Sequence, residues 1–236
     1  MASRTDTAEG AGATVRVATV QVIPALLRDF GLDPAVVVRE AGLAPELFDD
    51  PDNLLGYKAR GRLLAHCARR TGCPHFGLLV GERGGLHSLG LVGLLAKNSA
   101  DVGTALRNLA VYFHLHVRGA TTRLTVGDRS AVLAYGAYEP GAEGSEQVGD
   151  GAVSIMLNIM RSLCGRGWRP EEARFAHRRP ADVGPYRRLF QAPLVFDAGD
   201  YGLVFAHRWL EHRLEKPDAE LERLLRKHVA ALETVV

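Results

Sequence analysis

The chain has 236 residues, of which 47% are hydrophobic and 24% charged, as in soluble globular proteins that bury a full core. Its net charge of +2 excludes the strong basic excess that a nucleic-acid-binding surface usually carries. Three cysteines are too few for a secreted disulfide framework, and no window approaches the roughly 20 apolar residues that span a bilayer. We therefore expect a cytoplasmic protein.

The N-terminal part of the chain predicts a short leader and then two helices. Residues 1–14 are small and polar and lack an apolar signal core, so we expect a disordered leader. Apolar residues recur at helical spacing over 17–30, and Pro24 places the start of this helix late because proline is tolerated only in the first turn. Asp33 and Pro34 then provide an N-cap and a first helical residue for a second helix.

Further helices follow a loop at 43–54. An amphipathic pattern over 56–71 predicts a helix that ends at Gly72. The next stretch is apolar but rich in glycine, and we predict short helices at about 75–81 and 89–97 whose glycines let them approach closely. Ser99 is the expected cap of a longer helix, whose buried stripe contains Val102, Leu106, Leu109 and Phe113.

The second half of the chain is rich in β-forming residues. The segments 121–126 and 131–138 flank a Gly-Asp-Arg-Ser turn and predict a hairpin. Later segments predict a strand at 172–177, a short helix at 182–190, and strands at 194–196 and 201–206 that form a second hairpin.

Between these strands, residues 145–164 predict the central helix of the fold. Ser145 is a plausible N-cap and Gly165 a plausible end. Apolar residues cover most of the helix circumference, which indicates burial on nearly all sides. We therefore predict an α+β domain over 15–214, in which a helical N-terminal half is followed by an antiparallel sheet with helices packed on it in ββ-α-β-α-ββ order.

A separate C-terminal helix is predicted over 215–236. Its apolar seam alternates four-residue and three-residue steps, as in a short coiled coil; the seam comprises Leu221, Leu225, His228, Leu232 and Val235. The seam either packs on its own domain or contacts another subunit or domain. In the second case Leu221, Leu225 and Leu232 mediate dimerisation, and Leu225→Asp converts a dimer to a monomer.

Catalytic signatures are absent: the sequence contains no phosphate-binding loop GxxxxGK[ST], no GxSxG elbow and no HExxH. His114 and His116 would share one face of a strand and could hold a metal, but they point about 200° apart in a helix. We favour a helix and predict no metal or cofactor site. The histidines are then ordinary surface or core residues, or they line a ligand cavity.

Three stretches resemble the N-terminal effector domain of AraC/XylS-type bacterial transcription regulators. They are FGLLVGE (76–82), SLGLVGLLAKNSADVGTALRNLAVY (88–112) and RFAHRRPADVGPYRRLFQAPLVFDAGDYGLVF (174–205). The similarity is to the arabinose-binding-like branch, which includes ornithine-linked and virulence-linked regulators. It implies effector sensing and dimerisation, with DNA bound through a C-terminal helix-turn-helix part that this chain does not include. The chain is then either a piece of a longer regulator, which we favour, or a natural protein without that part.

Our own inference places the effector between the central helix and the sheet or the N-terminal helices. The candidate ligand-binding residues are Tyr112, His114, His116, Tyr135, Met156, Met160, Phe175 and His177. The two methionines lie one turn apart and suit either an adaptable pocket wall or plain core. Alternatives are a standalone small-molecule or haem-binding sensor, a dimerisation scaffold without a ligand, and a small enzyme that uses His177 with Glu139.

Overall fold

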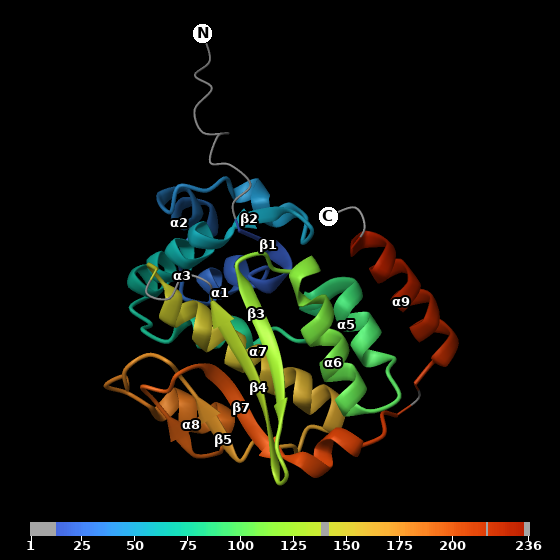
Figure 1. The fold of residues 1–236 in the computed structure, drawn as a ribbon. Helices are drawn as coiled ribbons and strands as arrows, with labels where there is room; N and C mark the ends of the chain where they lie inside the picture. The colour runs from blue at the N-terminus through green and yellow to red at the C-terminus, as the bar shows by residue number, and fades with distance from the viewer. Residues whose placement is uncertain (1–12, 138–141, 216, 234–236) are drawn as a thin grey trace.

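The computed structural model describes residues 13–137, 142–215 and 217–233, and these form the predicted α+β fold (Figure 1). A small antiparallel pair joins β1 (Thr14–Arg16) to β2 (Leu54–Gly56). A larger sheet has five strands in the order β3-β4-β7-β5-β6. Of the predicted leader, residues 1–12 lie outside the described residues, and Thr14 already belongs to β1.

The central helix α7 (Ser145–Cys164) has the predicted bounds and lies across the sheet, which it contacts through β4 and β7. Its other side packs against α3 (Tyr57–Thr71) and α4 (Phe76–Glu82). Burial on both sides explains why apolar residues surround it. The prediction of Ser145 as N-cap is wrong, because the cap is Gly144, whose φ of 74° is left-handed and favours glycine.

The first predicted hairpin is confirmed and the second is wrong. β3 (Ala120–Val126) pairs antiparallel with β4 (Ser130–Ala137), with Leu124 opposite Leu133. β6 (Leu194–Val195), however, pairs parallel with β5 (Glu172–Arg174), while β7 (Tyr201–Ala206) lies between β4 and β5.

Hydrogen bonds beyond β6 account for this difference. The amides of Asp197 and Ala198 donate to the carbonyl oxygens of His177 and Phe175. The chain after β6 therefore stays beside the segment that follows β5, and it does not turn back on β6. These contacts also end β5 at Arg174, three residues before the predicted end of the strand.

The N-terminal helices are α1 (Ile23–Asp29) and α2 (Pro34–Glu40), followed by a 3-10 turn at Pro45–Asp49. α1 starts late, as Pro24 predicted. The Asp33 side chain accepts a hydrogen bond from the Ala35 amide at 2.8 Å, which confirms it as the cap of α2. α1 packs on α2, α2 on α3, and α3 on the start of α7, where Gly61 lies beside Gly144 (Figure 1).

α5 (Gly90–Lys97) and α6 (Val102–Tyr112) follow α4 and a 3-10 turn at Leu86–Leu89. Ser99 was the wrong cap for α6, because Asp101 accepts the Thr104 amide at 2.7 Å. Ser99 is instead fully buried and donates to the Leu95 carbonyl oxygen. The predicted close approach of glycine-rich helices is confirmed for α4, where backbone of α7 lies directly beside Gly77 and Gly81.

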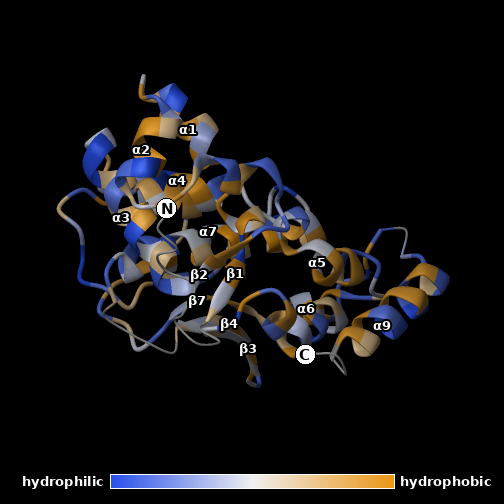
Figure 2. Cartoon of the chain, turned by 90° about the horizontal axis from the view of Figure 1, so that it is seen from above, coloured by the Kyte–Doolittle hydropathy of each residue, from blue (hydrophilic) through white to orange (hydrophobic). Residues whose placement is uncertain are grey.

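The C-terminal part contains α8 (Gly184–Phe190), a 3-10 turn at His207–Glu211 and α9 (Ala219–Glu233). Leu225 and Val229 of α9 are buried against Leu95 of α5, so the inner stripe of α9 packs on its own domain. Figure 2 shows α9 at the edge of the molecule, with apolar and polar residues on different sides. Val235 of the predicted seam lies outside the described residues.

Candidate ligand-binding site

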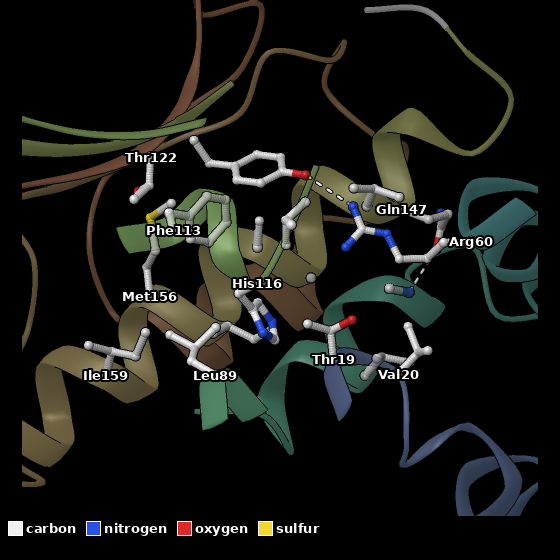
Figure 3. A pocket seen from close by; sticks show the side chains of 18 of the residues that line it. Thr19, Val20, Arg60, Leu89, Phe113, His116, Thr122, Gln147, Met156 and Ile159 are labelled. Carbon is white, nitrogen blue, oxygen red and sulfur yellow. Dashed lines mark hydrogen bonds between the residues drawn. The ribbon is translucent and has the colours of Figure 1, made fainter. Parts of the chain in front are cut away.

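A cavity lies between α7, β4 and the helices α3, α4 and α6 (Figure 3). The volume of the cavity is about 70 Å³, which is several times the roughly 10–15 Å³ that one water molecule requires. Its walls are mainly apolar, and the side chains that form them include Val80, Leu89, Leu109, Phe113, Leu133, Val148, Ile155, Met156 and Ile159. The lining thus comes from segments far apart in the sequence.

Arg60 of α3 brings a positive charge to this apolar cavity. Its side chain lines the cavity although the residue is only 6% exposed. Nη2 donates to the Tyr135 hydroxyl at 3.1 Å, and the guanidinium carbon lies 4.6 Å from the centre of the Tyr57 ring. Its Nε has no hydrogen-bond partner among the residues that the structure describes. No carboxylate in the described part of the chain pairs with Arg60.

Two tyrosines hold this arginine in place. The hydroxyls of Tyr57 and Tyr135 lie 2.7 Å apart in a buried hydrogen bond. Burial raises the pKa of Tyr57 well above its usual range, and the neighbouring Tyr135 adds to the rise, so Tyr57 stays protonated at neutral pH. The pair therefore presents a hydroxyl of Tyr135 and the aromatic face of Tyr57 to the guanidinium, and neither is a carboxylate that would pair with its charge.

His116 is the second buried polar residue of the cavity. It follows the 3-10 turn Phe113–Leu115 at the end of α6 and is 3% exposed. Neither ring nitrogen has a hydrogen-bond partner among the described residues. Burial, reinforced by the charges of Arg16 and Arg60, lowers the pKa of His116 to about 3. The imidazole is therefore neutral at physiological pH and carries one donor and one acceptor.

The other polar side chains of the lining already have partners. Thr19 donates to the Arg16 carbonyl oxygen, and Thr122 donates to that of Ala134. Gln147 accepts from the Gly77 amide and donates to the Pro74 carbonyl oxygen, both at 2.7 Å. Among the described residues that line this cavity, Arg60 Nε and the two ring nitrogens of His116 are thus the buried side-chain atoms without a hydrogen bond.

Three of the eight predicted ligand-binding residues line this cavity: His116, Tyr135 and Met156. The other five lie elsewhere. Met160 and Phe175 are fully buried core residues. Tyr112 is partly buried beside the cluster that α9 forms with α5, and His114 is exposed, with Nδ1 2.9 Å from the Val111 carbonyl oxygen.

His177 belongs to a separate buried cluster. Its Nε2 lies 2.8 Å from Asp150 Oδ1, and the Tyr186 hydroxyl donates to Oδ2 at 2.6 Å. Asp150 comes from α7 and Tyr186 from α8. Phe175 packs edge-on against Tyr186 with ring centres 5.2 Å apart, so two of the predicted residues meet here, away from the cavity.

The sequence reasoning missed Arg60, although a signal was present. Tyr57, Leu64 and Cys67 mark the buried face of α3, and Arg60 falls on that face because it lies three residues after Tyr57 and four before Leu64. A charged residue at such a position must be paired or functional.

Among the described residues there is no cluster of three or more metal-ligating side chains, and none of the helices described is long and apolar enough to cross a membrane.

Comparison with known proteins yields matches over most of the chain. A family profile described as the arabinose-binding domain of AraC transcription regulators, N-terminal, matches residues 31–214. The HTH-type transcriptional regulator VirS of Mycobacterium tuberculosis is 25% identical over 222 residues, which is 92% of this chain and 65% of VirS. The ornithine utilization regulator of Pseudomonas aeruginosa is 23% identical over 197 residues, 84% of this chain and 58% of that regulator.

One solved structure shares the fold. The transcriptional regulator CdpR of Pseudomonas aeruginosa superposes with a TM-score of 0.54 at 18% identity, covering 63% of this chain and 49% of CdpR. At this identity the likeness concerns the fold alone. The chain spans less than two thirds of the length of either curated relative.

Proposed function

The chain belongs to the family of N-terminal arabinose-binding domains of AraC transcription regulators, and on that premise we propose that it senses a small-molecule effector and transmits its binding to a DNA-binding part. The family is one of transcription regulators, and we propose no catalysis for this domain. Because transcription regulators of bacteria bind DNA in the cytoplasm, we propose a cytoplasmic location for this domain.

One observation carries the proposal: the cavity against α7 combines apolar walls with buried polar groups that form no hydrogen bond to any described residue. Buried polar groups are normally hydrogen-bonded, since leaving one unpaired costs about 1–3 kcal/mol. Arg60 Nε and both nitrogens of His116 depart from this rule at the same cavity. A pocket with few, convergent polar groups in an apolar lining is the usual form of a small-molecule site.

Transmission requires that the effector bind two arrangements of the domain unequally. The cavity borders α6, and α6 together with α5 packs against α9. A shift of α6 on effector binding would therefore reach α9, the last helix before a C-terminal DNA-binding part. We propose that Leu232, which is 37% exposed and lies two turns beyond the buried Leu225 on α9, contacts the same helix of a second subunit.

The test is a thermal-shift screen of the purified domain against amino acids, sugars, fatty acids and aromatic acids, because a ligand that binds only the native state raises the melting temperature. Ala152→Phe fills the cavity from α7, so it should abolish the response to any hit. Ser162→Phe places the same ring on an exposed position of α7 and should preserve it.

The two variants test where a ligand binds, and the screen itself separates a sensor from a scaffold without a ligand. A hit that survives Ala152→Phe contradicts binding in this cavity. A flat screen with a well-folded dimer favours a dimerisation scaffold that binds no effector.

A further inference from the structure

We infer that the cavity binds an organic acid with an apolar body, whose carboxylate pairs with Arg60 and whose body lies along α7. This inference rests on the proposed sensor function and specifies the chemical class of the effector. Arg60, Tyr135 and Met156 come from three separate elements, and all three line the cavity. Figure 3 shows Arg60 and Met156 on different sides of it.

The charge of Arg60 is the first argument. A guanidinium keeps its proton in proteins, so burial cannot be relieved by neutralisation. Its contacts in the described part of the chain are a tyrosine hydroxyl and a tyrosine ring, which satisfy some donors but supply no negative charge. A buried charge is usually paired, and a ligand carboxylate would complete the pair with two parallel hydrogen bonds, one of them from Nε.

The lining outside Arg60 argues for an apolar body. Leu89, Ile155 and Ile159 contribute only hydrocarbon to the cavity, and Met156 supplies an adaptable thioether. The threonines and the glutamine are already bonded to the backbone. A sugar would therefore lose most of its hydrogen bonds to water without replacement, and a cation would face Arg60 directly.

His116 limits the polar content of the ligand to one further group. It is neutral, and neither ring nitrogen has a hydrogen-bond partner among the described residues. It lies close enough to Arg60 for that charge to act on it. A single hydroxyl, keto or amide group, or the second carboxylate oxygen, would satisfy it. We therefore expect monocarboxylates to bind more tightly than dicarboxylates.

The experiment compares compounds that share a body and differ in the head group. The probes are straight-chain acids from hexanoate to dodecanoate and 4-phenylbutanoate, each with the matching alcohol and primary amine. Melting temperature and isothermal calorimetry are measured at pH 7.5. We expect at least one acid to bind at least tenfold more tightly than its alcohol, and the amines not to bind.

Arg60→Met removes the charge and keeps an apolar chain of similar reach, and it should weaken binding of that acid at least tenfold while leaving its alcohol unaffected. The matched control is Arg62→Met, which makes the same change two residues away on the exposed side of α3 and should bind like the wild type. Tyr135→Phe deletes the hydroxyl that orients Arg60 and should weaken binding by a smaller factor. This second variant keeps the test valid if Arg60→Met does not fold.

The outcomes distinguish the inference from the function on which it depends. If an alcohol or amine binds as tightly as its acid, or if Arg60→Met binds the acid like wild type, the carboxylate inference is overturned and the sensor stands. If no probe of this panel binds while the broader screen finds a sugar, the carboxylate inference fails and the sensor function stands. If neither set contains a ligand, both fail.

Discussion

His177 and Asp150 join the segment after β5 to the central helix through a hydrogen bond of 2.8 Å between Nε2 and Oδ1. The other ring nitrogen, Nδ1, lies 2.8 Å from the Arg178 carbonyl oxygen. Both nitrogens face acceptors, an arrangement that favours the doubly protonated imidazolium. Burial lowers the pKa of His177, but the hydrogen bond and the charge of Asp150 together outweigh it, and the pKa is raised.

His177→Gln should lower the free energy of unfolding by about 3 kcal/mol at pH 6, because removing one partner leaves Asp150 buried without its counter-charge. Urea denaturation measures the change. His228→Gln, at an exposed position of α9, is the control and should stay within about 0.5 kcal/mol of the wild type.

The same pair predicts a pH dependence with a definite sign. Because the folded pKa of His177 is raised, the folded state binds more protons above the unfolded pKa of about 6.5. The stabilisation is complete below that pH and is lost as pH rises through the folded pKa. The difference between wild type and His177→Gln should therefore shrink from pH 6 to pH 9. An equal difference at both pH values would show that folding does not raise the pKa of His177.

Gly81→Ala should destabilise the protein by about 3 kcal/mol, at the upper end of overpacking effects. An added Cβ would meet the Gly151 carbonyl oxygen and lie 2.6 Å from Ser154 Cβ, so α4 and α7 would have to separate. Gly167→Ala is the control, since nothing lies within 4 Å of its added Cβ. Thermal unfolding compares the two, and equal melting temperatures would contradict close helix packing as the reason for the glycine.

The sequence predicts the local elements of this fold better than their pairing. The end of α7 follows from Gly165, and its length follows from the apolar residues between Ser145 and Cys164. The cap of α2 follows from Asp33 and Pro34. β6, in contrast, pairs parallel with β5 because of backbone hydrogen bonds from Asp197 and Ala198. Such bonds depend on which segments meet in space, and no local pattern encodes them.

The same limit applies to the candidate site. The sequence predicted His116, Tyr135 and Met156 as pocket residues, and all three line the cavity. It also grouped them with His177, which lies in a separate cluster with Asp150. Residue type indicates which side chains can bind a ligand, but only the tertiary arrangement decides which of them share a cavity.

His116→Leu should raise the free energy of unfolding of the ligand-free protein by about 1–2 kcal/mol at pH 7, because it removes a buried imidazole whose nitrogens lack partners. A function that requires His116 would explain why a less stable residue is kept. Urea denaturation measures the effect, with the exposed His114→Leu as control. A loss of stability would indicate that His116 is bonded within the protein.

His116 also predicts a pH dependence opposite to that of His177. Its folded pKa of about 3 lies below the unfolded value of about 6.5, so the unfolded state binds the extra proton on acidification. The wild type therefore loses stability as pH falls below about 6.5. Relative to His116→Leu, this loss should reach about 2 kcal/mol between pH 7 and pH 5. If the difference in unfolding free energy between the wild type and His116→Leu does not change with pH, the buried imidazole of His116 is not held neutral.

The last prediction concerns α9, where two leucines should have different effects. Leu225 is 7% exposed and packs against Leu95, so Leu225→Asp should detach α9 whether or not the protein is a dimer. A loss of 2–3 kcal/mol for a buried leucine would speed amide hydrogen exchange of residues 219–233 by roughly 100-fold. The loss of a dimer in this variant alone would therefore not identify the interface.

Leu232→Asp makes the discriminating change, because Leu232 is 37% exposed and contributes little to packing within the domain. If Leu232 contacts α9 of a second subunit, this variant should sediment as a monomer with unfolding behaviour close to that of a wild-type monomer. Ala230→Asp adds the same single negative charge at another exposed position of α9 and is the control. A Leu232→Asp protein that keeps the mass of a dimer would place the interface elsewhere, and transmission to the DNA-binding part would then not pass through paired α9 helices.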